Sequence, residues 1–277
     1  MSFANIQSVQ NPRVKSLVRL REARHRRRLE RFLIEGRREL TRALACHWPL
    51  ETVYFCPERF KAPAQDEPDA LSVVEQAEDA GAEIVQLSPE AFDKVCYREG
   101  PDGLLAVAEI RERDLAELAE RLAALDHPAL LLVVEAVEKP GNLGALLRTA
   151  DAAGVDAVVV CDHRTDLFNP NAIRASQGAF FSVPTYLSET RELRPLLRQA
   201  GVTPVATTPR AEKTIWQQDL RGPIALVLGA ESIGLSEDWL DGDTLTAHLP
   251  MQGVTDSLNV SVAAALVIFE AVRQRVG

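Results

Sequence analysis

The sequence contains no run of 18 or more apolar residues, which is about the length that a helix needs to cross a membrane. Its first fifteen residues, MSFANIQSVQNPRVK, lack the apolar core of a secretory signal peptide. We therefore expect a cytoplasmic protein with no membrane partner.

Signatures of metal binding and redox chemistry are also missing. The chain has four cysteines without a Cys-x-x-Cys pair, and its five histidines are dispersed. These spacings predict no metal site and no histidine-based triad, and they favour free thiols in a reducing compartment. No Gly-x-Gly-x-x-Gly follows an early strand, which disfavours an ordinary Rossmann cofactor site.

The net charge of −9 argues at first against a nucleic-acid partner, but its distribution is uneven. Residues 11–42 contain twelve Lys and Arg against four Glu, a local net charge of +8 that leaves −17 for the remainder. Such asymmetry indicates polyanion binding, because each phosphate contact releases counterions. A solvated charged helix is the alternative.

Short apolar runs alternate with amphipathic stretches and predict an α/β protein. We divide the chain into an N-terminal domain 1–110, a helical linker 111–127 and a C-terminal domain 128–277. For the first domain we expect basic helices within 11–29, strand 31–35, a helix to about residue 46, strand 52–56, helix 71–80, strand 83–87, helix 89–95 and strand 104–109.

The second domain alternates strands and helices more regularly. We expect strand 130–135, helix 143–153, strand 155–160, helix 170–178, strand 182–186, helix 190–200, strands 202–206, 224–228 and 244–249, and helix 258–275. Continuous apolar strands in alternating βα units predict a parallel sheet that is covered on both faces.

Three segments of this domain combine glycines and polar side chains beside strand ends: EAVEKPGNLGALLRTADAA (135–153), LVLGAESIGLS (226–236) and LPMQGVTDSLNVS (249–261). Each has an ordinary alternative when taken alone. The first could be an Asn cap and a solvated Arg, the second a strand-ending turn, and the third a helix capped by Ser257 or Asn259.

Together the three segments resemble the SpoU (TrmH-type) branch of the SPOUT RNA methyltransferases. The first carries Asn-x-Gly-x-x-x-Arg, and the second carries Gly-x-Glu-x-x-Gly with Ser232 where glycine is common. The third carries Pro-Met followed by Ser-Leu-Asn-Val-Ser. The motif positions are Asn142, Gly144, Arg148, Gly229, Glu231, Gly234, Pro250, Met251 and 257–261.

The resemblance implies a deep trefoil knot in the C-terminal parallel sheet and S-adenosylmethionine as the cofactor. The catalytic residues that it implies are Arg148, Asn142, Glu231, Ser257 and Asn259. The cofactor contacts that it implies, largely through the backbone, are Gly229, Ile233, Leu249, Met251 and Leu258. Ser176 is a further candidate contact.

The reaction that the resemblance implies is methyl transfer to a ribose 2′-hydroxyl. Arg148 is the family's reactive position, and its role stays open between a base and a phosphate clamp. A guanidinium has a pKa above about 12 and stays protonated in proteins, which favours the clamp. Glu231 is better interpreted as holding its loop than as half of a carboxylate pair.

The N-terminal domain is similar, more weakly, to the ribosomal-protein-like substrate-binding module of many SpoU enzymes. The expected RNA contacts are Arg26, Arg27, Arg28, Arg37 and Arg148. We expect 23S ribosomal RNA as substrate and a homodimer through the apolar C-terminal helix. The alternatives are a tRNA methyltransferase, an antibiotic-resistance enzyme of the same architecture, and a non-catalytic RNA-binding module.

Overall fold

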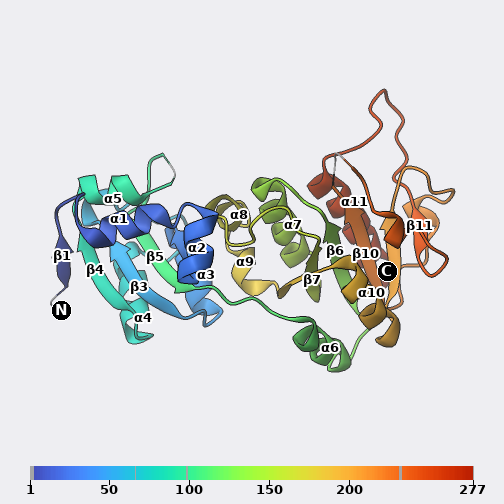
Figure 1. Cartoon of the computed structure of the whole chain (residues 1–277), viewed down its shortest axis with the longest axis horizontal. Helices are drawn as coiled ribbons and strands as arrows, with labels where there is room; N and C mark the ends of the chain where they lie inside the picture. Colours follow the sequence, from blue (N-terminus) through green and yellow to red (C-terminus); the bar gives the residue numbers. More distant parts are fainter. Residues whose placement is uncertain (1–2, 66, 98, 231–232, 277) are drawn as a thin grey trace. The chain divides into compact units, whose positions relative to one another are not determined.

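The computed structural model describes residues 3–65, 67–97, 99–230 and 233–276 (Figure 1). The chain forms two compact units. The first consists of Met1–Arg111 and Asp166–Ser182, and the second of Glu112–Thr165 and Val183–Gly277. Within the described residues, no helix is long and apolar enough to cross a membrane.

The first unit is built on a mixed five-stranded sheet in the order β1-β4-β3-β5-β2. Strands β1, β4 and β3 are parallel, whereas β5 is antiparallel to β3 and β2. The strands are β1 (Ala4–Ile6), β2 (Arg31–Glu35), β3 (Leu50–Phe55), β4 (Glu83–Leu87) and β5 (Leu104–Glu109). The helices are α1 (Pro12–Arg19), α2 (Ala23–Leu29), α3 (Arg37–Ala45), η1 (Pro57–Arg59), α4 (Ala70–Asp79), α5 (Pro89–Val95), α8 (Pro170–Ala175) and α9 (Ala179–Ser182).

The segment that carries α8 and α9 differs from its prediction in two ways. A helix over 170–178 was expected, but α8 ends at Ala175, and left-handed backbone angles at Gln177 and Gly178 (φ 52° and 94°) separate it from a second short helix, α9, that was not predicted. A Cβ at Gly178 would lie 2.4 Å from Cγ of Arg42, so only glycine fits there. The segment also packs with the first unit, where the rings of Phe168 and Phe32 are 5.0 Å apart.

The second unit contains a six-stranded sheet in the order β11-β9-β10-β6-β7-β8, in which every pair is parallel. Its strands are β6 (Leu130–Glu135), β7 (Ala157–Cys161), β8 (Thr185–Ser188), β9 (Thr203–Thr207), β10 (Ile224–Gly229) and β11 (Leu245–Ala247). Its helices are α6 (Leu115–Ala123), α7 (Pro140–Ala152), α10 (Thr190–Gln199), η2 (Ile215–Gln217), η3 (Glu237–Trp239) and α11 (Val260–Val276).

Helices cover both faces of this parallel sheet, as predicted. Leu118 of α6, Leu193 of α10 and Trp239 share one core with alternate residues of the strands. Helices α7 and α11 pack against each other, and α11 also packs against β10 (Figure 1). Because all six strands point the same way, their carboxyl ends meet at one edge, where the three motif segments begin. The knot itself remains a prediction from the resemblance.

Candidate active site

A pocket of about 540 Å³ lies beside the carboxyl ends of β9, β10 and β11. We call it the motif pocket, and it is defined by residues 207–209, 228–230, 234, 248–252, 256–258, 260 and 263. Five of the predicted site residues line it: Gly229, Leu249, Met251, Ser257 and Leu258. Its volume lies within the range of about 300–1,000 Å³ that is typical of cofactor and ligand sites.

Gly229 ends β10 in a tight turn that forms one wall of the motif pocket. The N–H of Gly234 donates to the carbonyl of Ala230 at 2.8 Å and closes the turn. A Cβ at Gly229 would lie 2.3 Å from the Gly234 carbonyl oxygen. Glycine is therefore required at this position because the backbone at Gly234 approaches it too closely for a side chain.

Asn259 connects the loop of the third motif to the first motif. Its Oδ1 accepts hydrogen bonds from the backbone N–H (3.0 Å) and the hydroxyl (2.6 Å) of Ser261, so the side chain caps α11. Its Nδ2 donates to Oδ1 of Asn142 on α7 at 3.2 Å. The two predicted catalytic asparagines are therefore brought together.

Arg148 lies on α7 six residues after Asn142, and its side chain is exposed. It lines no described pocket and forms no hydrogen bond or ion pair with another described residue. The guanidinium is thus available to a ligand that approaches from solvent.

The two remaining predicted site residues are Ile233 and Glu231. Ile233 is 58% exposed and lines a neighbouring pocket instead, which corrects its assignment as a cofactor wall. Glu231, which the resemblance places among the catalytic residues, and Ser232 lie outside the described residues. Gly234 lines both pockets, which are therefore adjacent.

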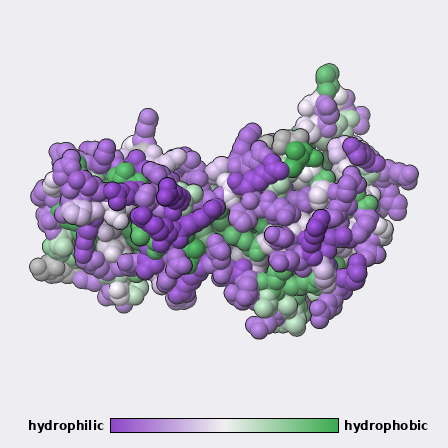
Figure 2. All heavy atoms as spheres, in the orientation of Figure 1, coloured by the Kyte–Doolittle hydropathy of each residue, from purple (hydrophilic) through white to green (hydrophobic). Residues whose placement is uncertain are grey.

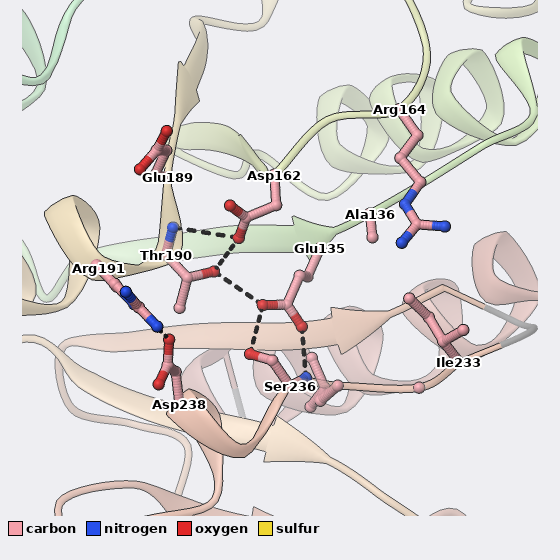
Figure 3. Close-up of a pocket in the computed structure, with 12 residues that line it drawn as sticks. Glu135, Ala136, Asp162, Arg164, Glu189, Thr190, Arg191, Ile233, Ser236 and Asp238 are labelled. Carbon is pink, nitrogen blue, oxygen red and sulfur yellow. Dashed lines mark hydrogen bonds and ion pairs between the residues drawn. The ribbon is translucent and has the colours of Figure 1, made fainter.

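The neighbouring pocket, of about 600 Å³, is lined in part by a buried acid, Glu135, that was not predicted from the sequence (Figure 3). Glu135 ends β6 and is 3% exposed. Its carboxylate accepts from the backbone N–H and hydroxyl of Ser236, both at 2.7 Å, and from Nε1 of Trp239 at 3.1 Å. Glu135 therefore anchors the segment that follows the Gly229 turn.

Thr190 connects this acid to a second carboxylate (Figure 3). Its Oγ1 lies 2.8 Å from Oε1 of Glu135 and 2.6 Å from Oδ2 of Asp162, although a hydroxyl has one hydrogen to donate. Ala136 and Asp162 follow adjacent strands and both adopt left-handed angles, which is rare for non-glycine residues (φ 55° and 47°). An acid at the end of an otherwise apolar strand was the signal for this cluster.

A cysteine beside this cluster does not supply a nucleophile. Burial, reinforced by the charge of Asp162, raises the pKa of the Cys161 thiol to about 12, so the thiol stays protonated near neutral pH. Among the described residues, no group of three or more His, Cys, Asp or Glu could hold a metal ion.

The structure corrects two of the predicted RNA contacts. Arg26 is 1% exposed, and its guanidinium donates to Asp166 and to the carbonyls of Leu20 (2.8 Å) and Arg21 (2.7 Å). Arg37 is also buried, where it donates to backbone carbonyls of 61 and 62 and to a carboxylate. Both arginines hold the first unit together and do not face a phosphate.

The neighbouring Arg27 and Arg28 do point into solvent. Arg28 lies 3.1 Å from Nδ1 of His25, and Arg27 forms no ion pair with another described residue. These two remain predicted RNA contacts.

Family comparisons agree with this geometry. A model of the SpoU rRNA Methylase family matches residues 129–269, and a model of the MRM3-like substrate binding domain matches residues 11–106. The 23S rRNA (guanosine-2′-O-)-methyltransferase RlmB of Ralstonia nicotianae is 36% identical over 228 residues, which cover 82% of this chain and 88% of that protein.

Two solved structures are similar over almost the whole chain. The crystal structure of an RNA 2′-O ribose methyltransferase has a TM-score of 0.80 at 40% identity and covers 99% of this chain and 100% of its own. An AdoMet-bound rRNA methyltransferase from Sinorhizobium meliloti has a TM-score of 0.86 at 26% identity and covers 98% of each chain.

The fold and these matches define an RNA methyltransferase with a SPOUT-type catalytic unit. The chain belongs to the SpoU rRNA methylase family. The predicted family and enzyme class are thereby confirmed, and so is the predicted fold class apart from the knot.

Proposed function

We propose that the protein transfers the methyl group of S-adenosylmethionine to the ribose 2′-hydroxyl of a guanosine in 23S ribosomal RNA. The observation that carries the proposal is the Asn259–Asn142 hydrogen bond beside the motif pocket, since it joins the first and third motifs at one place. The guanosine and the 23S RNA come from the name of the Ralstonia relative.

The motif pocket suits the cofactor in size and in character. Its side walls include Leu249, Met251 and Leu258, and the Gly229 turn offers backbone groups. Such a lining fits a ligand that is held by apolar contact and by the main chain. The cofactor supplies a methyl group on a sulfonium, which is already activated for transfer.

The protein must then orient the ribose and favour loss of its hydroxyl proton. Arg148 is exposed on the helix that also carries Asn142, so its guanidinium can bind the phosphate of the target nucleotide. The positive charge of the Arg148 guanidinium near the 2′-hydroxyl stabilises the negative charge that develops on the hydroxyl oxygen. Asn142, Ser257 and Asn259 fix the geometry around it, and the same role is proposed for Glu231 in its loop.

RNA affinity comes mainly from domain 1–110, and domain 128–277 carries out the methyl transfer. Arg27 and Arg28 are exposed on α2, and neither is held by a carboxylate of the described residues. Ribosomal RNA as substrate also accords with a cytoplasmic location.

We further propose a symmetric homodimer through α11. This helix buries Val260, Ala264, Val267, Ile268 and Ala271 in its own unit. A second apolar stripe, Val262, Leu266 and Phe269, is 42–48% exposed at i, i+4 and i+7 spacing. A surface helix needs only one apolar stripe, and the second suits a self-complementary interface.

Mapping ribose methylation in total RNA tests the substrate assignment. The RNA from a strain that lacks the gene should lose one 2′-O-methyl group in 23S RNA, and the wild-type gene should restore it. Loss of the mark from a tRNA instead would replace the 23S assignment with the tRNA alternative.

A further inference from the structure

Two buried polar atoms of the motif pocket have no hydrogen-bond partner among the described residues. They are Oγ1 of Thr207 and Nδ1 of His248. A buried polar group without a partner is energetically costly, so native proteins retain few of them. Two such atoms in one pocket indicate that a bound ligand supplies the hydrogen-bond partners that the protein lacks.

The two residues are held firmly by their backbones. Thr207 ends β9 and pairs with Leu228 and Ala247 of the neighbouring strands. His248 follows Ala247 directly; its N–H donates to the carbonyl of residue 213, and its carbonyl accepts from the N–H of residue 215, both at 2.9 Å. Only the side chains are left without partners.

We propose that Thr207 and His248 supply side-chain hydrogen bonds to the adenosine part of the bound cofactor, an inference that rests on the proposed function. A threonine hydroxyl and a neutral imidazole can each donate or accept, and so can the ribose hydroxyls of adenosine. The other walls of the pocket are largely apolar, which leaves these polar groups of the ligand in need of partners.

Neither atom reaches solvent in the ligand-free chain. Both residues line the pocket, so the proposed contacts require a rotation about the Cα–Cβ bond of Thr207 and a flip of the His248 ring that present the two atoms to the ligand. In this proposal, the rotations exchange two unpaired atoms for two hydrogen bonds when the ligand arrives.

Thr203 provides a matched control on the same strand. It is exposed at the start of β9 and does not line the motif pocket. Thr207→Val and Thr203→Val are therefore the same substitution at opposite ends of one strand, but only the first removes a hydroxyl from the motif pocket.

The test measures the binding of S-adenosylhomocysteine by calorimetry, together with the ligand-free melting temperature. Thr207→Val should weaken binding about three- to tenfold, the range for loss of one hydrogen bond, without lowering the ligand-free melting temperature. Thr203→Val should leave affinity within about twofold. For the histidine, His248→Asn keeps an amide near the position of Nδ1 and should retain affinity, whereas His248→Leu should lose it to a similar extent as Thr207→Val.

The outcomes separate this inference from the proposed function. A wild-type protein that binds no S-adenosylhomocysteine would refute the function itself. Wild-type affinity that persists in both Thr207→Val and His248→Leu would refute only the inference. A lower ligand-free melting temperature with unchanged affinity would assign the two side chains to folding and would also overturn it.

Discussion

Nδ2 of Asn259 donates to Oδ1 of Asn142 across a 3.2 Å gap, and this bond joins the start of α11 to the start of α7. The Oδ1 of Asn259 is occupied by the N–H of Ser261, which fixes the direction of the amide. One side chain thus caps a helix and holds the neighbouring motif.

Asn259→Ser separates these two roles. Serine is a good N-cap but is too short to reach Asn142, so stability should stay close to wild type while methyl transfer falls about 100-fold from misplacement of the site. Asn259→Ala loses the cap as well and should destabilise the protein by about 1 kcal/mol more. Chemical denaturation and single-turnover rates provide the two readouts. Normal turnover in Asn259→Ser would show that the cross-link is dispensable.

Gly229→Ala should abolish cofactor binding by distorting the turn. The added Cβ would lie 2.3 Å from a backbone oxygen that cannot move aside cheaply, and overpacking of this kind costs about 1–3 kcal/mol. Gly242→Ala is the control, because a Cβ there meets nothing within 4 Å. Calorimetry and thermal melting should show losses for the first variant alone. Equal affinity in the two variants would mean that the turn takes no part in the site.

We expect the arginines of helix α2 to fall into two groups, one that stabilises the first unit and one that binds RNA. Replacement of Arg27 and Arg28 by alanine should flatten the logarithmic salt dependence of RNA binding by at most about 1.8 units, at about 0.9 per duplex phosphate contact. Cofactor affinity should not change, because both residues lie in the first unit. Filter binding across a salt series checks this, and an unchanged slope would make the exposed charges a solvated surface.

Arg26→Ala belongs to the same experiment as a contrast. It removes the partner of Asp166 and two hydrogen bonds from Nη1 to backbone carbonyls, so it should cost about 3 kcal/mol of stability. Its main effect should therefore appear in denaturation rather than in the salt slope.

Phe269→Glu should convert the proposed dimer into a monomer of 30.4 kDa, because it places a charge in the exposed stripe of α11. Leu71→Glu changes an exposed leucine of α4 in the same way and should leave the mass unaltered. Light scattering at micromolar concentration measures both. A wild-type protein that is already monomeric and active would contradict the interface.

Most of the fold could be predicted because short apolar runs that are bounded by polar residues are typical of buried strands. The strand at 31–35 and the strand at 130–135 have the predicted limits in the structure. Strand β1 was missed, since three residues that pair only at the sheet edge carry no pattern of their own. The break between α8 and α9 depends on left-handed angles at Gln177 and Gly178, which tertiary packing selects.

The prediction of site residues was less complete, because a count of charged residues does not show which of them are buried. Arg26 stands in a run of arginines that looks uniform in sequence, yet its position on α2 turns it inward. Glu135 was overlooked because its hydrogen-bond partners are distant in the sequence. These partners, Thr190, Ser236 and Trp239, are 55 to 104 residues away. Motif spacing located the pocket, but side-chain partners required the structure.

The central claim is methyl transfer to a ribose of ribosomal RNA that depends on Arg148. The direct measurement incubates purified protein with 23S RNA and S-adenosylmethionine that carries a labelled methyl group, and then digests the product to nucleosides. We predict label in 2′-O-methylguanosine for the wild type, and none for Arg148→Ala although that variant still binds the cofactor. Arg148→Lys should rescue little, since lysine lacks the planar fork. Label on a base, or full transfer by Arg148→Ala, would contradict the account.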